Sequence, residues 1–325
     1  MELYATPDNP VPDGAIVAEI TTRDGFRLRA ARWPAAPGVP RRGTVCLFHG
    51  RTEFIEKYFE VIAELRGRGF AAATLDWRGQ GGSERIPGTA LCHVESFADY
   101  DRDFDAFIRE IVLPDCPLPH YALAHSTGAL ICLRAAGEGR ARFTRMVLNA
   151  PLLRLSRRTA PPMGWVRFIG AVSLFLGLDD RPAFEGPWKR KPHAVLHTSD
   201  ERRYRRFMDV LAAWPALDVG RPTARWLHEA ARAMRQAERR DFAARIAIPT
   251  LIVMPGADGL VAIDAIEALA AELRTASAVT IPGARHEVLL ENDGLRQLFW
   301  AAFDAFIPGE ALDGLLTEDS QDPVV

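Results

Sequence analysis

The stretch from Tyr121 to Leu130 constrains the fold of this chain more than any other. An apolar run that predicts a buried strand leads into Ser126, and the run from Leu130 to Ala136 that follows favours a helix. Small residues, Ala124 and Gly128, lie two positions before and after the serine. This pattern predicts a nucleophile elbow, a sharp strand-to-helix turn that lifts one hydroxyl above the edge of a sheet. An ordinary serine in a strand-to-helix loop is the alternative that this segment alone leaves open.

The overall composition is typical of a soluble globular protein. The 325 residues are 48% hydrophobic and 25% charged, enough for one large α/β domain with an insertion or for two domains. The net charge of −2 gives no indication of a nucleic-acid partner. Residues 1–13 lack the pattern of a signal peptide, and the apolar residues 165–178 are too short and too interrupted a run to span a bilayer. We therefore expect a cytoplasmic protein.

The four cysteines have no paired C-x-x-C spacing, and two of them lie in apolar runs. We expect reduced thiols rather than disulfides. No group of histidines or cysteines has the spacing of metal ligands, so we expect neither a metal nor another cofactor. The cysteines are Cys46, Cys92, Cys116 and Cys132.

Buried-strand and helix patterns alternate over about 100 residues on either side of a central region that has no strand pattern. This alternation predicts an α/β fold with a doubly wound, mostly parallel sheet, preceded by a hairpin over residues 15–30 that turns at Asp24-Gly25. The predicted strands are 44–48, 70–75, 121–125, 146–148, 249–254 and 277–281, and the predicted helices are 54–65, 97–112, 130–136, 263–274 and 295–307.

Changes in the strand, helix and charge patterns divide the chain into four parts. We interpret residues 1–151 and 245–308 as the two halves of one α/β core. Residues 152–244, which we call the cap, read as a helical insertion, with helical patterns over 200–214 and 224–244. Residues 309–325 are acidic and polar and read as a mobile tail.

Three chemically active side chains follow predicted strands in the order serine, acid, histidine. Ser126, Asp258 and His286 each come just after a strand, so a parallel sheet would bring them to the same edge. A serine needs a base to accept its proton, and the base needs an orienting acid. Asp264 is a weaker candidate for the acid because it lies one turn into the next helix. Among eight histidines, only His286 follows a late strand.

Two backbone amides are candidates for an oxyanion hole, which must present N–H donors to the negative oxygen of a tetrahedral intermediate. In this arrangement one donor belongs to the residue after the nucleophile, Thr127, and the other to the loop after the first core strand, most plausibly Arg51.

Five short motifs lie at the ends of predicted strands: His49-Gly50-x-x-Glu53, Asp76-x-Arg78-Gly79-x-Gly81-x-Ser83, His125-Ser126-x-Gly128, Gly256-Ala257-Asp258 and Gly283-x-x-His286. With Thr198-Ser199-Asp200 and Gly220-x-Pro222-Thr223-x-x-Trp226 in the cap, they resemble the monoacylglycerol lipase and bacterial lysophospholipase branch of the α/β-hydrolases. The match extends from about residue 20 to residue 307, and the block 76–83 is its most specific part.

The resemblance implies a serine hydrolase that cleaves an ester of a glycerolipid or lysophospholipid through an acyl-enzyme formed at Ser126. It also implies structural rather than chemical roles for Glu53, Asp76 and Arg78. The chain departs from the pattern at the elbow, where Ala124 replaces the first glycine and Ala129 stands where a second glycine often follows. These departures affect the tightness of the elbow rather than the fold.

Charge is distributed unevenly along the chain. Between residues 152 and 245, 19 Lys and Arg face 10 Asp and Glu, a net charge of +9, so the remainder carries −11. A basic cap would attract anionic lipid headgroups at the inner membrane face, and the apolar residues 165–178 would line an acyl pocket or rest on lipid. Solvated helix faces with internal charge pairs, and packing of the cap on the core, explain the same pattern.

Two other functions remain open on this fold. A peptidase of the proline-iminopeptidase type would need acidic residues in the cap to hold a free amine, which the basic excess disfavours. A non-catalytic binding protein would usually lack one of the three active side chains, whereas Ser126, Asp258 and His286 are all present.

Overall fold

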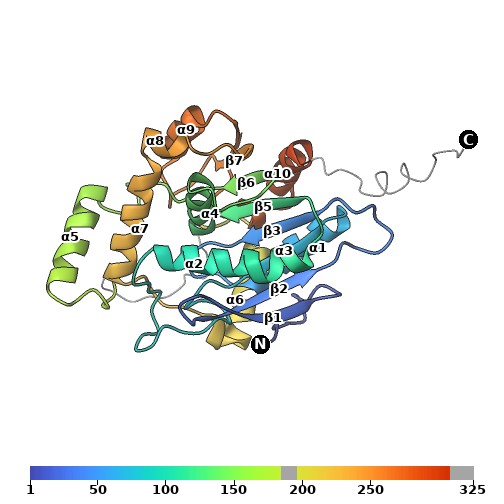
Figure 1. Cartoon of the computed structure of the whole chain (residues 1–325), viewed down its shortest axis with the longest axis horizontal. Coiled ribbons are helices and arrows are strands. Elements are labelled where there is room, and N and C mark those ends of the chain that lie inside the picture. Colours follow the sequence, from blue (N-terminus) through green and yellow to red (C-terminus); the bar gives the residue numbers. More distant parts are fainter. Residues whose placement is uncertain (184–195, 308–325) are drawn as a thin grey trace, which may run out of the picture.

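The computed structural model describes residues 1–183 and 196–307 (Figure 1). Eight strands form one sheet in the order β1-β2-β4-β3-β5-β6-β7-β8. β1 and β2 pair antiparallel, as do β2 and β4, and every other neighbouring pair is parallel. The strands are β1 (Ile16–Thr21), β2 (Arg27–Trp33), β3 (Thr44–Phe48), β4 (Ala71–Leu75), β5 (His120–His125), β6 (Arg145–Asn149), β7 (Thr250–Pro255) and β8 (Ala276–Ile281).

The predicted doubly wound, mostly parallel sheet is therefore confirmed, and the predicted strands lie within one or two residues of their observed bounds. One detail of the hairpin was wrong. The loop between β1 and β2 spans residues 22–26 rather than two residues, because the Thr22 hydroxyl accepts from the Phe26 amide and bonds to Asp24. These side-chain bonds stabilise a wider turn than a tight Asp-Gly hairpin.

Helices cover both faces of the sheet. The helices of the core are α1 (Phe59–Gly67), α2 (Ala98–Phe107), α3 (Leu113–Asp115), α4 (Thr127–Gly137), α9 (Ile263–Glu272) and α10 (Asp293–Phe306); short η1 (Ile55–Tyr58) precedes α1, η4 (Val288–Leu290) precedes α10, and a π-helical turn, η2 (Ile108–Val112), joins α2 to α3. The helices between residues 152 and 244 are α5 (Met163–Phe175), α6 (Glu201–Ala213), η3 (Pro215–Leu217), α7 (Ala224–Ala237) and α8 (Arg240–Ala243).

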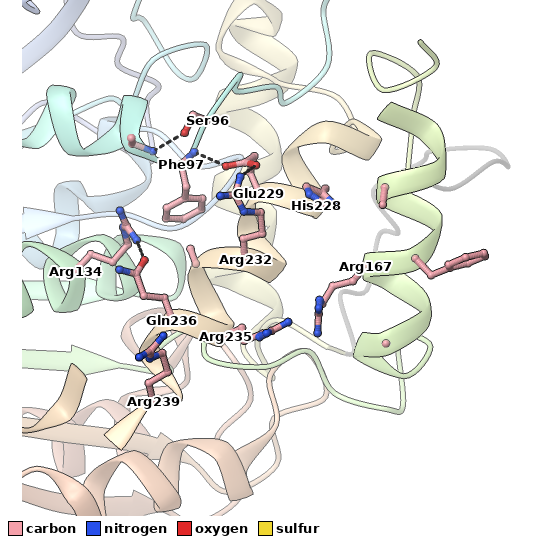
Figure 2. A pocket seen from close by; sticks show the side chains of 15 residues that line it. Ser96, Phe97, Arg134, Arg167, His228, Glu229, Arg232, Arg235, Gln236 and Arg239 are labelled. Carbon is pink, nitrogen blue, oxygen red and sulfur yellow. Dashed lines mark hydrogen bonds and ion pairs between the residues drawn. The ribbon is translucent and has the colours of Figure 1, made fainter. Parts of the chain in front are cut away.

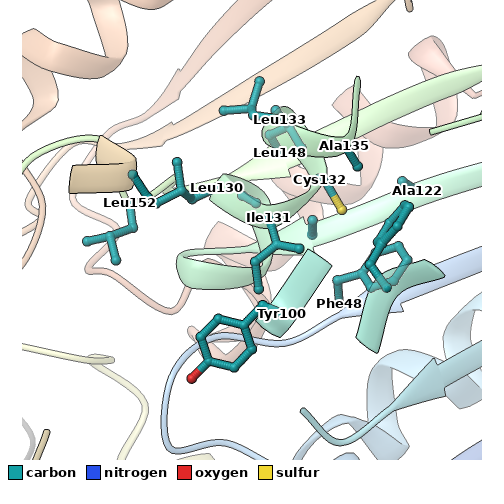
Figure 3. Packing of buried hydrophobic residues seen from close by; sticks show 14 of the residues in the cluster. Phe48, Tyr100, Ala122, Leu130, Ile131, Cys132, Leu133, Ala135, Leu148 and Leu152 are labelled. Carbon is teal, nitrogen blue, oxygen red and sulfur yellow. The ribbon is translucent and has the colours of Figure 1, made fainter. Parts of the chain in front are cut away.

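Strand β5 shows how the sheet divides the hydrophobic core into two layers. Ala122 and Ala124 face a cluster that includes α2, α4 and α9, whereas Tyr121 and Leu123 face a second cluster that includes α1 and α10. Figure 3 shows α4 packed on the sheet within the cluster that contains Ala122 and Ala124. Its side chains Leu130, Ile131 and Cys132 lie close to side chains of the sheet. Both faces of β5 are buried, which explains why its sequence is a continuous apolar run.

The described cap residues form the helices α5 to α8 and the loops between them, and α5 lies at the outer edge of the molecule beside α7 (Figure 1). Within residues 1–183 and 196–307, no helix has both the length and the apolar character needed to cross a membrane. The predicted acidic tail lies outside the described residues, as do the cap's basic residues Lys189, Arg190 and Lys191.

Candidate active site

Ser126 occupies the sharp turn that the sequence predicts. It stands between β5 and α4 with φ of 51° and ψ of −113°, a positive φ that non-glycine residues rarely adopt. The turn is fixed on both sides, because the Ser126 amide donates to the Asn149 carbonyl at 3.0 Å and its carbonyl accepts from the Leu152 amide at 3.1 Å. Local strain of this kind persists where surrounding bonds determine the conformation, and it is common at functional sites.

Gly128 allows α4 to approach the end of β3. A Cβ atom at this position would lie 2.4 Å from the Phe48 carbonyl oxygen and 2.5 Å from the His49 carbonyl oxygen. Ala124, the departure from the usual elbow, is fully buried within β5. The elbow therefore requires a glycine after the serine, whereas its other small position accommodates a methyl group.

We expect Gly128→Ala to destabilise the chain, because the added methyl must push α4 away from main-chain oxygens that cannot rotate aside. The expected loss in free energy of unfolding is about 1–3 kcal/mol, the usual cost of overpacking. Urea denaturation would measure it, with Gly164→Ala on α5, where a Cβ meets nothing within 4 Å, as the matched control. Equal stability of the two variants would contradict the close approach.

The three predicted side chains meet at the carboxyl edge of the sheet. His286 Nε2 lies 3.1 Å from Ser126 Oγ, and His286 Nδ1 lies 2.7 Å from Asp258 Oδ2. The other carboxylate oxygen of Asp258 accepts from the Leu260 and Val261 amides at 2.7 and 3.0 Å. Ser126 follows β5, Asp258 follows β7 and His286 follows β8, so the topology of the sheet determines their convergence.

The charge next to His286 stabilises the protonated form of its imidazole. Burial opposes the charge of His286, but the adjacent Asp258 carboxylate outweighs it and raises the pKa above the ordinary 6.5. Burial also opposes the charge of Asp258, yet His286 and the two amides lower its pKa. His125, whose ring lies 4.8 Å from that of His286, is different: burial lowers its pKa to about 4, so it is neutral near pH 7.

The weaker candidates lie elsewhere. The side chain of Asp264 is 71% exposed and pairs with Arg154 at 3.2 Å. His49 is buried behind the site, with Nε2 3.4 Å from Asp76 and its carbonyl accepting from Trp77 Nε1. Among the described residues, no group of three or more His, Cys, Asp or Glu is arranged to hold a metal ion. All four cysteines are free thiols.

The two predicted oxyanion residues line the same cavity as Ser126. Thr127 is the first residue of α4, and the first-turn amides of a helix have no partner within the helix. On either side of Arg51, the Gly50 amide donates to Glu53 at 2.5 Å and the Thr52 amide donates to Gln80 at 2.6 Å, which fixes this loop. The Arg51 guanidinium stacks over the Trp226 ring at 5.2 Å.

A buried charge network under the site was not foreseen from the sequence. Lys57 donates to Glu53 at 2.6 Å and to Glu287 at 2.7 Å, and Glu287 also bonds to His197 of the cap at 2.9 Å. Burial opposes all three charges, but their mutual attraction dominates. The pKa of Glu53 falls to about 2, the pKa of Glu287 falls well below its ordinary value, and the pKa of Lys57 rises. The network links the Gly50–Glu53 loop to the residue after His286.

One sequence signal pointed to part of this network. Glu53 and Lys57 are four residues apart, which is the spacing of a helical ion pair. Their connection to Glu287 spans 230 residues and requires the fold. The resemblance assigns structural roles to Glu53, Asp76 and Arg78. These side chains bond to main-chain atoms and to buried charged groups. Asp76 accepts from the Ile55 and Gly82 amides, and Arg78 pairs with Asp103 at 2.7 Å.

The cavity at Ser126 has a volume of about 190 Å³ and a largely apolar wall on the side of the cap. Its described carboxylates are Glu53 and Glu287, both already bound to Lys57. The apolar residues of the wall are Leu152, Leu155, Ala160, Pro222, Trp226, Leu227, Leu260 and Val261.

A mostly parallel sheet with a serine at a strained turn and a histidine and an acid at neighbouring strand ends defines an α/β-hydrolase. Residues 39–293 match the family described as "Serine aminopeptidase, S33", and the chain belongs to this family.

Relatives with assigned names support the same grouping. The chain is 30% identical to lysophospholipase L2 of Escherichia coli strain K12 over 298 residues, which cover 86% of this chain and 84% of the relative. It is 27% identical to the probable lysophospholipase L2 of Haemophilus influenzae, covering 79% of this chain and 80% of the relative. It is thus an α/β-hydrolase similar to the bacterial lysophospholipases, as the motifs predict.

Solved structures show the same fold. A soluble variant of monoglyceride lipase from Saccharomyces cerevisiae superposes with a TM-score of 0.72 at 20% identity, covering 90% of this chain and 96% of that one. The monoacylglycerol lipase of Paleococcus ferrophilus gives a TM-score of 0.67 at 23% identity, covering 86% and 98%.

Proposed function

We propose that this chain hydrolyses carboxylic esters of monoacyl lipids, of the lysophospholipid or monoacylglycerol class, with Ser126 as nucleophile, His286 as general base and Asp258 as its orienting acid. The observation that carries the proposal is the continuous chain of short contacts from Ser126 Oγ through His286 to Asp258. The names of the relatives, lysophospholipase L2 in particular, support the choice of substrate class.

The geometry supports acyl transfer in two halves. His286 Nε2 takes the Ser126 proton as Oγ attacks the ester carbonyl, and the amides of Arg51 and Thr127 donate to the oxyanion. Asp258 holds the proton on Nδ1 and stabilises the imidazolium, which then protonates the leaving alcohol. Water, activated by the same imidazole, attacks the acyl-enzyme and releases the fatty acid, and the proton returns to Ser126.

The cavity supports an apolar acyl group next to the nucleophile. Its volume of about 190 Å³ is smaller than the roughly 300–1,000 Å³ of typical ligand pockets, so a long chain would extend beyond the enclosed part, along the apolar cap wall. An aminopeptidase would need an available carboxylate for the substrate's ammonium group. The described carboxylates of the lining are both held by Lys57, which favours the ester substrate over the amine.

A substrate comparison tests this assignment. Purified protein is given lysophosphatidylcholine, a monoacylglycerol, p-nitrophenyl butyrate and prolyl-p-nitroanilide at equal concentrations, and kcat/KM is measured for each. We expect turnover of the esters and at least one monoacyl lipid, with the amide at the background rate. Preferred cleavage of the prolyl amide would replace the lipase assignment with the peptidase one.

The pH dependence of hydrolysis follows from the pKa of His286. Only the neutral imidazole accepts the Ser126 proton, and Asp258 raises the pKa above 6.5, so the protonated, inactive form persists to a higher pH. We expect kcat/KM for p-nitrophenyl butyrate to rise with pH through an inflection above 6.5. Asp258→Asn should lower the rate by about four orders of magnitude and remove the upward shift. An inflection near pH 4 would instead implicate His125.

A further inference from the structure

A second pocket lies beside the active-site cavity, where the chain leaves β6 and enters the cap. We call it the basic pocket. It has a volume of about 700 Å³ and is lined by residues of the segment 154–163 on one side and by Asp258 and residues 261–264 on the other. Leu155 and Val261 line both the basic pocket and the cavity at Ser126, so they form a partition between the two spaces.

Main-chain hydrogen bonds hold this partition in place. Leu155 and Val261 pair as an antiparallel bridge, and the Ser156 amide donates to the Leu260 carbonyl at 2.9 Å. These bonds tie the segment 154–163 to the loop that follows Asp258. The basic pocket therefore has a defined position next to the reacting groups.

Three arginines line the basic pocket, and they differ in their partners. Arg154 pairs with Asp264 at 3.2 Å and with Glu238 at 3.3 Å. Arg157 and Arg158 are exposed, and in the described parts of the chain neither guanidinium has a hydrogen-bond or ion-pair partner. An anion that contacts both would relieve the repulsion between two adjacent like charges. Guanidinium groups bind phosphate oxygens through two parallel hydrogen bonds, so phosphate is the group that fits here.

A larger basic crevice, between α5 and α7, is less suited to the substrate (Figure 2). Its volume is about 1020 Å³, but none of its lining residues also lines the cavity at Ser126. Three of its five arginines pair with carboxylates. These pairs are Arg134–Asp101, Arg232–Glu229 and Arg239–Asp241. A group covalently linked to an ester at Ser126 has a shared wall with the basic pocket and none with this crevice.

Charge indicates where the two ends of a bound ester lie. The side of the cavity formed by Trp226 and Leu227 of α7 is apolar and suits the acyl chain. Glu53 and Glu287 on another side both bind Lys57, so this group has a net negative charge and repels a phosphate. The basic pocket beyond the partition attracts it.

We propose that Arg157 and Arg158 bind the phosphate of a lysophospholipid whose ester carbonyl lies at Ser126. The acyl chain follows α7, and the headgroup passes Leu155 into the basic pocket. The contact makes the enzyme prefer lysophospholipids to monoacylglycerols. This inference rests on the proposed function and narrows its two substrate classes to the one that carries a phosphate.

Kinetics with matched short-chain lipids test the proposal. Octanoyl lysophosphatidylglycerol and octanoylglycerol are used below their micelle concentrations, so that no lipid surface takes part, and each kcat/KM is divided by that for p-nitrophenyl butyrate. Wild type should prefer the lysophospholipid about tenfold or more, because hydrogen bonds to charged groups are strong. Arg157→Gln/Arg158→Gln should remove the preference, and salt at about 0.5 M should weaken it in wild type.

Matched variants separate phosphate binding from a general loss of charge. Arg202→Gln/Arg205→Gln on α6 removes two exposed arginines elsewhere and should keep the wild-type preference. Arg157→Lys/Arg158→Lys should keep part of it, since lysine retains the charge but not the planar fork. Glycerol phosphate should inhibit wild type more strongly than glycerol does, and Arg157→Gln/Arg158→Gln should abolish this difference.

The possible failures are distinct. Equal turnover of the two lipids by wild type, or equal loss of preference in the α6 control, would overturn the phosphate site and leave the ester hydrolase assignment intact. Inhibition by inorganic phosphate that depends on Arg157 and Arg158, without any effect on lipid preference, would show a site for free phosphate and also overturn the proposal. Absence of turnover of both lipids would overturn the proposed function together with this inference.

Discussion

Replacing Ser126 with alanine is expected to reduce kcat for ester hydrolysis by about four to six orders of magnitude. Without the hydroxyl there is no acyl-enzyme, and only binding and the oxyanion donors remain to assist water. The fold should survive, because the strained backbone requires no serine: Ala150 in the same chain also has a positive φ, of 47°. Active-site titration with a fluorophosphonate probe, together with turnover of p-nitrophenyl butyrate, measures the effect.

The matched control is Ser277→Ala, on the exposed side of β8, which should hydrolyse esters and react with the probe as wild type does. Thermal denaturation should give similar midpoints for Ser126→Ala, Ser277→Ala and wild type. If folded Ser126→Ala still turned over the ester or was labelled by the probe, another residue would have to be the nucleophile.

Replacing Lys57 with methionine is expected to lower the free energy of unfolding by about 3–5 kcal/mol, the usual result of removing one partner from a buried ion pair. The side chain is 2% exposed and lies between Glu53 and Glu287, so its loss leaves two carboxylates facing each other without a cation. Ester hydrolysis should fall as well, because Glu53 also holds the Gly50 amide of the loop beside Ser126.

The effect of Lys57→Met should depend on pH in a defined direction. In wild type, the depressed pKa values of Glu53 and Glu287 give stability above their unfolded pKa near 4.5, which is lost as pH falls. The variant lacks this contribution, and its carboxylates protonate more readily. The difference in stability from wild type should therefore shrink as pH falls from 7 to 3, through the unfolded pKa near 4.5 and toward the folded pKa of about 2 for Glu53, as urea denaturation at the two pH values would show.

The exposed pair Arg205–Glu201 provides the control. Its side chains are 69% and 60% exposed, and Arg205→Met should change stability by less than about 0.5 kcal/mol at either pH. Similar losses for Lys57→Met and Arg205→Met would show that the buried network contributes little.

Local sequence predicted the sheet and the positions of the chemical groups because both follow from short-range patterns. The apolar run before Ser126 is buried on both faces, and the order Ser126, Asp258, His286 follows the order of strands. The structure brings these three side chains together, while their catalytic roles, like the oxyanion roles of Arg51 and Thr127, stay predictions.

Features that depend on contacts between distant segments were beyond sequence reasoning. Glu287 is an ordinary polar residue in the sequence, and only the fold places Lys57 beside it. The apolar content of α5 is equally compatible with a core helix, since periodicity shows that one face is apolar but not what covers it. The β1–β2 loop is wider than the pair Asp24-Gly25 predicts, because Thr22 forms side-chain hydrogen bonds within the loop. The Asp-Gly pattern does not take such bonds into account.

The three side chains follow strands that are held in the sheet to different extents. Ser126 is anchored at β5, with parallel neighbours on both sides, whereas His286 follows β8, the last strand of the sheet, which is paired along one side only. Opening of a sheet begins at its margins, where fewer bonds must break. The proposed proton acceptor thus follows a strand at the margin of the sheet, so small fluctuations there would separate it from the hydroxyl while the centre of the protein stayed intact.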